Sequence, residues 1–385
     1  MEIEPKDLQQ AKKSASGLIK QAIRDRIFPG AALALFDAGG PLFTLCEGRL
    51  HYGAWAEPVS SSTLFDLASL TKPMVTATLA MQLTEKGLLD LDRPLGEYLG
   101  SRSGGNITPR HLLTHSSGLP AHEELWNRKG LRRAGAGRLT DISLSDRSLA
   151  DRKRVTEYLL QLSEKAQAPV PTYSDLGFIL LGILIERLTG KGLEASFFEM
   201  AEGCSIRGLY SQALIRQQGV DAPCAPAGWC PYRRRMLRAE VHDMNAWFLG
   251  GFAGHAGLFG TIGAVTDFLA RLLASFEGDR AQNCPASREM VRRFWTPGTV
   301  ENSPWAMGFD LPSSKGSSAG RHFSKRSVGH LGYTGTSFWI DLERGLGMVL
   351  LSNRTFPMDT PSSRLAIKRL RPAIHDAVMG HIAAS

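Results

Sequence analysis

A serine and a lysine three positions apart stand in an otherwise apolar stretch, FDLASLTKPMVTATLAMQL, at residues 65–83. On the first turn of a helix, positions i and i+3 share one face with Cβ atoms roughly 5–6 Å apart, so Lys72 can reach Ser69. Desolvation by apolar neighbours favours a neutral amine, which can take the proton of a serine hydroxyl. The helix start also offers free NH groups to developing negative charge. The spacing therefore predicts an activated nucleophile, against the alternative of an N-cap serine followed by an exposed lysine.

A tyrosine and an aspartate precede a second apolar stretch, APVPTYSDLGFILLGILIERLTG, at residues 168–190. At the end of a loop, Tyr173 can aim its hydroxyl at Ser69 and act as an acid or a base when a nearby cation lowers its pKa. The competing interpretation makes Tyr173 a packing residue and Asp175 a helix cap. Asp175 can cap the helix in either case.

A glycine-rich entry into a β-rich segment is the third feature, GHLGYTGTSFWIDLERGLGMVLLSN, at residues 329–353. Glycines let bare backbone NH groups approach a substrate, and such groups are what an oxyanion hole needs. Glycines before a strand also form ordinary turns, so this segment alone leaves both interpretations open.

Two further segments could be mistaken for functional motifs. GSSAG satisfies G-x-S-x-G at Ser318, but it lies in a Gly/Ser/Lys loop and not between a strand and a helix. GGFAGHAGLFG at 250–260 is glycine-rich, yet it fits neither G-x-G-x-x-G nor a P-loop. Neither segment is therefore taken as a nucleophile or a phosphate site.

Histidine and cysteine spacing predicts no metal site and no cofactor. His111 and His115 share a helix face, but HLLTH lacks the Glu of H-E-x-x-H and no third ligand suggests itself. Together with His242 and His255 they are interpreted as structural or pocket-lining. The five cysteines lack C-x-x-C spacing, which indicates reduced thiols. They are Cys46, Cys204, Cys224, Cys230 and Cys284.

The composition, 43% hydrophobic and 21% charged over 385 residues, is typical of a globular protein. Six glycines interrupt the longest uncharged run, residues 244–266, so we expect no membrane span. Residues 1–28 mix both charge signs without an apolar h-region, which predicts a cytoplasmic protein with no membrane partner.

The net charge of +8 comes from clusters such as 128–138, 151–154 and 232–238. No nucleic-acid motif accompanies them, so we expect no nucleic-acid partner.

The candidate residues must be positioned by strands at both ends of the chain and by helices between them. Such an order suggests one sheet completed by the two termini, with a helical part inserted. Residues 313–326 are the most linker-like segment. The hydrophobic patterns predict helices at 6–26, 175–189 and 362–383 and strand pairs within 30–50 and 336–354.

Taken in order, S-x-x-K, Y-x-N/D and K/H-x-G resemble the penicillin-recognising serine hydrolases, in particular the class C β-lactamase branch with its DD-peptidase and esterase relatives. Supporting segments include FDLASLTKPMVTA, ITPRHLLTHSSGLP and AEVHDMNAWFLGGFAGHAGLFGT, and the resemblance runs from about residue 15 to 375. It implies an α+β fold of the β-lactamase/transpeptidase type, with an antiparallel sheet flanked by helices. It also implies one domain over 1–385, with an α/β part at about 1–65 and 285–385 and an inserted helical subdomain at about 66–284.

Carried over position by position, the resemblance makes Ser69 the acylated nucleophile, with Lys72 and Tyr173 sharing the general-base role. The backbone NH groups of Ser69 and Tyr333 would form the oxyanion hole. The residues implied to contact substrate are Asp175, His330, Leu331 and Gly332.

Two departures from the family pattern bear on the substrate. Asp175 stands where many relatives have Asn; an ionised Asp only accepts hydrogen bonds, and it favours a charged Lys72. Leu331 removes the hydroxyl that would bond a substrate carboxylate, and a neutral His330 supplies no fixed charge. We therefore expect a carboxylesterase or amidase acting on a small acyl substrate. The alternatives are a β-lactamase or D-alanyl-D-alanine carboxypeptidase, and a catalytically idle scaffold or binding module; the oligomeric state stays open.

Overall fold

The computed structural model describes residues 3–100, 106–134, 148–164, 171–278, 283–297 and 303–382. Among these residues the main element is a seven-stranded sheet in which every strand pair is antiparallel. In spatial order its strands are β2 (Gly40–Gly48), β1 (Gly30–Asp37), β12 (Leu346–Ser352), β11 (Ser337–Asp341), β10 (Ser327–Leu331), β9 (Phe309–Asp310) and β8 (Trp305–Ala306). Strands from both ends of the chain therefore meet at the β1–β12 pair.

Strand β1, which lies next to the edge strand β2, separates two hydrophobic cores because its side chains alternate between the faces of the sheet. Leu33 and Leu35 pack into one core, and Ala34 and Phe36 into the other. Since every one of these side chains is fully buried, β1 is covered on both faces.

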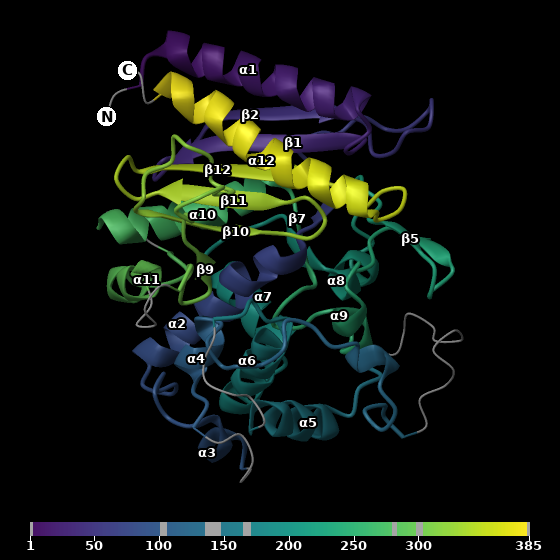
Figure 1. Cartoon of the computed structure of the whole chain (residues 1–385), viewed down its shortest axis with the longest axis vertical. Helices are drawn as coiled ribbons and strands as arrows, with labels where there is room; N and C mark the ends of the chain where they lie inside the picture. Colours follow the sequence, from purple (N-terminus) through teal and green to yellow (C-terminus); the bar gives the residue numbers. More distant parts are fainter. Residues whose placement is uncertain are drawn as a thin grey trace.

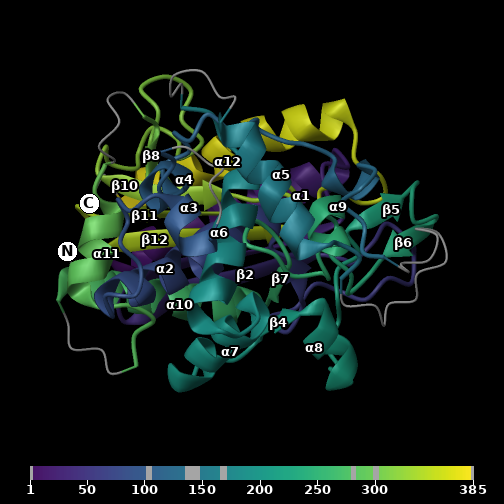
Figure 2. The same ribbon diagram turned by 90° about the horizontal axis from the view of Figure 1, so that it is seen from below.

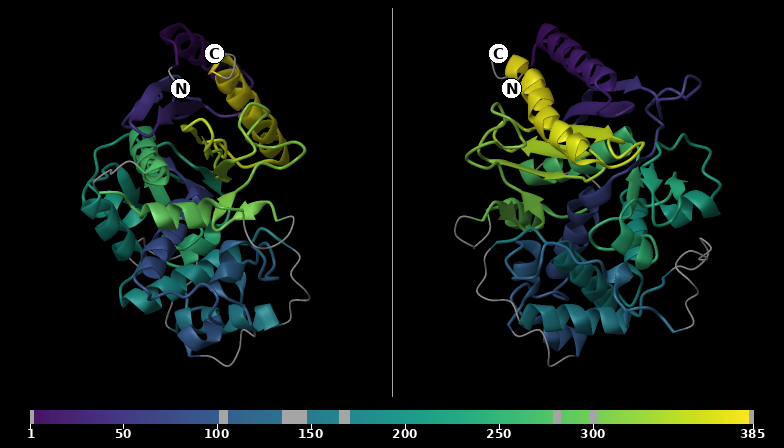
Figure 3. Two further views of the ribbon diagram at one scale, coloured as in Figure 1. Left: turned by 90° about the vertical axis from the view of Figure 1, so that its left-hand side faces the viewer. Right: turned by 45° about the vertical axis from the view of Figure 1, so that its right-hand side comes forward.

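Helices cover both faces of the sheet (Figures 1 and 3). The terminal helices α1 (Pro5–Arg24) and α12 (Pro361–Ile382) lie side by side on one face, where they share a core with Leu33 and Leu35. Helix α10 (Ile262–Glu277) packs on the opposite face. Its buried side chains belong to the larger of the two cores, the one that contains Ala34 and Phe36. The sheet is thus the middle layer of three.

A mainly helical region extends below the sheet (Figures 1 and 2). Nine residues of its apolar helix α6 (Asp175–Thr189) are buried. The other helices are α2 (Thr78–Glu85), α3 (Leu95–Leu99), α4 (Pro109–Leu113), α5 (Arg152–Glu164), α7 (Leu193–Gly203), α8 (Gln212–Gln217), α9 (Met244–Phe248) and α11 (Arg288–Trp295). Two small sheets accompany them, β3 (Phe65–Asp66), β7 (Leu258–Gly260) and β4 (Leu209–Ser211), and β5 (Gly228–Cys230) with β6 (Arg235–Leu237).

The fold class expected from the sequence is confirmed, and the predicted terminal helices and strand pairs agree with the structure within a few residues. The division into an α/β part and an inserted subdomain at the stated boundaries stays a prediction. Residues 135–138 of the basic cluster at 128–138 lie outside the described residues.

The segment at 313–326 is less linker-like than its composition indicates, because it is bonded to α12. Asp376 accepts a hydrogen bond from the Arg321 side chain at 3.1 Å, and His375 Nδ1 bonds the Ser318 carbonyl at 2.8 Å. Ser318 is therefore held by its backbone at the surface of α12, in keeping with its rejection as a nucleophile.

In the described part of the chain, every helix is either too short or too polar to cross a lipid bilayer.

Candidate active site

Ser69 lies on a tight turn whose backbone is held by a buried carboxylate. The turn is a 3₁₀ segment, Ala68–Leu70, and Ala68 adopts a positive φ of 47°. Positive φ is strained for a residue with a Cβ atom, so other contacts must hold it. Asp66 does so, because its Oδ1 accepts a hydrogen bond from the Ala68 NH at 2.9 Å.

The regular α-helix expected after Ser69 is not what the structure shows. Lys72–Ala77 forms a π-helical segment, and α-helical geometry begins only at Thr78. Pro73 offers a physical reason, since proline has no NH to donate to the preceding turn. The predicted proximity survives this change: Lys72 Nζ lies 3.0 Å from Ser69 Oγ.

Lys72 is fully buried and forms an ion pair with Asp175, whose Oδ1 lies 2.7 Å from Nζ. Burial alone would lower the pKa of this lysine, but the charge of Asp175 and the contact with Tyr173 raise it overall. Burial alone would likewise raise the pKa of Asp175, yet Lys72 and His122 hold it well below its usual range. The free protein therefore carries an ammonium at Lys72, as the Asp175 departure predicted, and not a neutral amine.

Tyr173 is brought to the same place by the start of α6. Ser174 caps this helix through its Oγ, so the cap is Ser174 and not Asp175. His115 Nδ1 accepts a hydrogen bond from the Ser174 NH at 3.0 Å, and its ring packs 4.6 Å from that of Tyr173. Lys72 Nζ lies 4.7 Å from the centre of the Tyr173 ring. Burial raises the pKa of Tyr173 more than Lys72 lowers it, so the phenol is neutral in the free protein.

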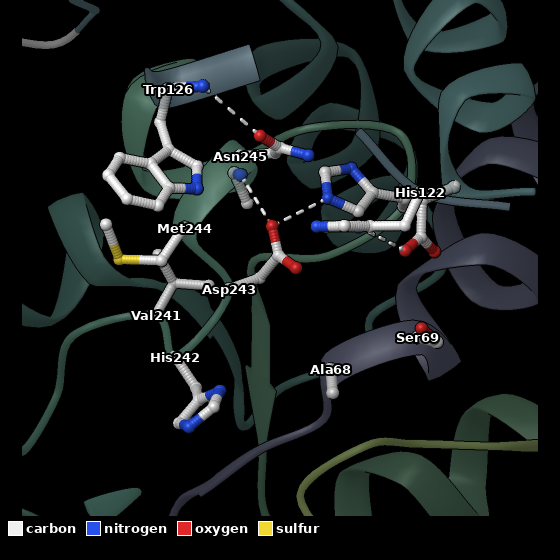
Figure 4. Close-up of polar contacts among 12 residues, drawn as sticks. Ala68, Ser69, His122, Trp126, Val241, His242, Asp243, Met244 and Asn245 are labelled. Atoms are coloured by element: carbon white, nitrogen blue, oxygen red, sulfur yellow. Dashed lines mark hydrogen bonds and ion pairs between the residues drawn. The ribbon is translucent and has the colours of Figure 1, made fainter. Parts of the chain in front are cut away.

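Two carboxylate–imidazole pairs lie near Ser69, and Figure 4 labels one member of each pair, His122 and Asp243. His122 Nδ1 is 3.5 Å from Asp175 Oδ2, so Asp175 bridges a half-exposed imidazole and the buried lysine. Asp243 Oδ1 is 2.7 Å from His255 Nε2 and also accepts a hydrogen bond from the Ala246 NH. Burial would raise the pKa of Asp243, but the charge of His255 brings it to about 2. Both carboxylates are therefore ionised at neutral pH.

The segment that carries Asp243 is joined to the nucleophile turn. The His242 NH donates to Asp66 Oδ2 at 2.7 Å, while the other oxygen of Asp66 holds Ala68. The His242 ring in turn packs 5.7 Å from the ring of Tyr333. One buried carboxylate thus connects the turn of Ser69 with a segment that reaches Tyr333.

His330 lies on β10 with its ring 6.0 Å from that of Tyr173. Its Nδ1 bonds the Leu331 carbonyl at 2.9 Å, which requires a proton on Nδ1 and leaves a lone pair on Nε2. Among the described residues, Nε2 has no hydrogen-bond partner. Burial, with the charge of Lys72, lowers the pKa of His330 to about 3. His330 is therefore a neutral imidazole close to Tyr173, and its contact with substrate stays a prediction.

Gly332 lets the segment after β10 pass close to the turn that carries Ser69. A Cβ atom there would lie 1.9 Å from Thr336 Oγ1 and 2.8 Å from the Leu67 carbonyl, so a larger residue would push the two segments apart. Two hydroxyls bind the segments together: Thr334 Oγ1 donates to the Asp66 carbonyl at 2.6 Å, and Thr336 Oγ1 to the Leu67 carbonyl at 3.1 Å.

The backbone NH groups of Ser69 and Tyr333 form no hydrogen bond to a backbone carbonyl in the described residues. Free NH groups from two joined segments are what an oxyanion hole requires. The Tyr333 side chain itself points away, with its hydroxyl donating to Asp359 at 2.6 Å.

Sequence reasoning missed the roles of His122, Asp243 and Asp66. The segment AEVHDMNAW was noticed as a whole, but no spacing rule links Asp243 to His255 or Asp66 to His242. Each of these contacts depends on the folded chain. The described residues contain no group of three or more His, Cys, Asp or Glu side chains arranged to hold a metal ion, and all five cysteines are free thiols.

Comparison with known proteins gives one family over most of the chain. A family model described as Beta-lactamase matches residues 15–370. An N-acetylmuramyl-L-alanine amidase of Bacillus subtilis is 26% identical over 358 residues, 85% of this chain and 77% of that protein. A putative D-alanyl-D-alanine carboxypeptidase of Escherichia coli K12 is 27% identical over 323 residues, 77% of this chain and 71% of that protein.

A solved structure shares the fold. The octameric penicillin-binding protein homologue from Pyrococcus abyssi superimposes with a TM-score of 0.67 at 21% identity, covering 93% of this chain and 76% of that one. At this level of identity the likeness supports the architecture and nothing finer.

Proposed function

The chain belongs to the β-lactamase family, and from that premise we propose that it is a serine hydrolase working through an acyl-enzyme on Ser69. The observation that carries the proposal is the 3.0 Å contact between Lys72 Nζ and Ser69 Oγ, on a turn whose own NH group is free. The relatives named amidase and carboxypeptidase are hydrolases, which supports the reaction class.

The proposed reaction begins when Ser69 Oγ attacks the substrate carbonyl carbon and gives its proton to the Lys72–Tyr173 pair. The carbonyl oxygen becomes an oxyanion that accepts hydrogen bonds from the NH groups of Ser69 and Tyr333. Collapse of this intermediate releases the leaving group, which takes the proton back from the pair. Water then attacks the acyl carbonyl by the same proton transfers in reverse and frees the acid.

The positive charge on Lys72 sets a condition on these reaction steps. An ammonium donates hydrogen bonds and cannot accept the serine proton, and Tyr173 is a neutral phenol in the free protein. The coupled pair must therefore lose one proton before it can serve as base, and that proton belongs to the pair and not to either residue. Hydrolysis should accordingly increase with pH until the pair has titrated.

We further propose a carboxylesterase or amidase acting on a small acyl substrate. The wall at His330 is neutral, Leu331 has no hydroxyl, and Asp175 is an ionised acceptor. None of these three groups attracts the carboxylate that a β-lactam or a D-Ala-D-Ala terminus carries. The second candidate, a β-lactamase or D-alanyl-D-alanine carboxypeptidase, is favoured by the relatives that bear the latter name.

The two substrate classes can be separated by turnover of p-nitrophenyl acetate and nitrocefin, with the Ser69→Ala variant as the background. We expect kcat/KM for the ester to exceed that for nitrocefin by at least about a hundredfold, since the missing carboxylate contacts are worth roughly 1.5–3 kcal/mol each. Faster nitrocefin turnover would reverse the assignment. Equal rates with the Ser69→Ala variant on both compounds would favour an idle scaffold or binding module.

A further inference from the structure

A pocket of about 940 Å³ lies between loop 313–321, the end of β10 and the first half of α12. Of the described residues that line it, none is Ser69, Lys72 or Tyr173, so it is separate from the nucleophile. Its apolar lining comes from Leu331, Leu365, Ile367 and Pro372.

The polar lining of this α12 pocket is strongly basic. Its cations are Arg321, Arg354, Arg364, Lys368, Arg369 and Arg371. Asp376 neutralises Arg321, and Asp359 is shared between Arg354 and Arg364. Within the described residues, Lys368, Arg369 and Arg371 form no ion pair, so the pocket holds more positive than negative charge.

Arg371 makes this excess of charge unusual, because it is 7% exposed. Its Nη2 donates to two carbonyls, those of Gly332 at 2.6 Å and Thr336 at 2.8 Å. Among the described residues its Nε, like that of Arg354, has no partner. Burial and the neighbouring charge of Arg354 lower the pKa of Arg371 to about 9. Buried cations are normally paired with an anion, and here the protein supplies none in contact.

We propose that the α12 pocket binds a small anionic amphiphile, a carboxylate or phosphate head joined to a short apolar body, independently of the nucleophile. The head would be held by the exposed Lys368 and Arg369, with the buried positive charge of Arg371 adding to the attraction. The body would lie against Leu331 and Leu365. Both parts are needed, because the cations and the apolar side chains line one cavity.

The pocket shares its wall with the oxyanion strand. Arg371 holds the Gly332 carbonyl, and Arg354 donates to the carbonyl of Tyr333. Gly332 and Tyr333 are joined by the peptide bond whose NH, that of Tyr333, donates to the oxyanion in the proposed reaction. The arginines that fix this peptide therefore also line the pocket in which the anion would bind.

Calorimetric titration with octanoate, octyl phosphate and octanol tests the proposal without any need for hydrolysis, so its failure leaves the proposed function untouched. We expect at least one of the two anions to bind at least tenfold more tightly than octanol, and the stronger anion identifies the head. Inorganic phosphate alone should bind more weakly than octyl phosphate, because it lacks the apolar body.

Variants locate the site. Lys368→Glu removes an exposed cation from the lining, and Leu365→Asp places a carboxylate on a half-exposed side chain of the lining. Each should weaken binding of the stronger anion about fivefold or more, whereas Lys12→Glu, the same charge change on the exposed face of α1, should leave it within twofold. Equal binding of octanol, or anion binding that neither lining variant changes, would overturn the proposal.

Discussion

The two sides of the proposed catalytic centre are built on opposite electrostatic principles. The charged side consists of two groups of acids and bases in contact. Asp175 contacts Lys72 and His122, and Asp243 contacts His255. The strand side consists of a neutral imidazole and backbone groups, His330 to Tyr333. A substitution on the charged side should therefore change how the reaction depends on pH, whereas one on the strand side should change the rate equally at every pH.

Replacement of Lys72 by Ala should have the largest effect. It removes the group that contacts Ser69 Oγ at 3.0 Å and leaves Asp175 ionised in a site built for an ion pair. We expect kcat/KM for p-nitrophenyl acetate to fall roughly 10⁴-fold or more, as for other nucleophile–base units. Lys86→Ala, at an exposed lysine beyond the end of α2, is the matched control. A loss smaller than tenfold would separate Lys72 from the chemistry.

Replacement of Asp175 by Asn tests the charged side most specifically. The carboxylate holds the proton on Lys72, so its removal should let the Lys72–Tyr173 pair lose that proton at lower pH. We expect the rise of kcat/KM with pH to move toward acid by about one unit or more, the size of change that loss of a close opposite charge produces. The measurement is a pH–rate profile of both proteins. An unchanged midpoint, or a shift toward alkali, would show that Asp175 does not control the base.

Replacement of Gly332 by Ala tests the strand side. The added Cβ would meet Thr336 Oγ1 and the Leu67 carbonyl, and so displace the peptide that leads to the Tyr333 NH. We expect kcat to fall about tenfold to a hundredfold, at most about as much as when a whole oxyanion-hole donor is removed. The midpoint of the pH–rate profile should stay the same. Gly17→Ala, on α1 where a Cβ meets nothing, should leave kcat unchanged. A moved midpoint would contradict the separation of the two sides.

Replacement of His122 by Gln should have the smallest effect, because this imidazole is half exposed and 3.5 Å from Asp175. Its contact with Asp175 raises the pKa of His122, so the protonated imidazole competes with Lys72 for the carboxylate below that pKa. The Lys72–Tyr173 pair titrates at a higher pH, where His122 is neutral, so the pH–rate midpoint should move by no more than a few tenths of a unit. A change in kcat at high pH would instead give His122 a direct part in the reaction.

The large sheet was predictable from sequence in part, although β10, which carries His330, lay outside the strand pairs expected at 30–50 and 336–354. Alternating apolar residues and glycines predict strands locally, which is why β1, β2, β11 and β12 fell within the expected segments. The proximity of Ser69 to Lys72 also depends on local spacing, and it survived the replacement of the α-helix by 3₁₀ and π-helical turns.

The charged side could be predicted only in part. Asp175 was expected to favour a charged lysine, because the resemblance placed it beside Lys72. Asp243 caps the short helix α9 and His255 lies twelve residues further on, beyond that helix, while His122 and Asp175 are 53 positions apart. Contacts of this kind arise from packing and leave no pattern in the sequence. The same holds for the α12 pocket, whose outer wall looked like a linker.

The most direct test of the central claim is intact-protein mass spectrometry after treatment with a fluorophosphonate. The account predicts one adduct on the unaltered protein, assigned to Ser69 by peptide mapping, and none on the folded Ser69→Ala variant. An adduct that persists in Ser69→Ala, or its absence from the folded unaltered protein, would contradict the assignment of Ser69 as the nucleophile.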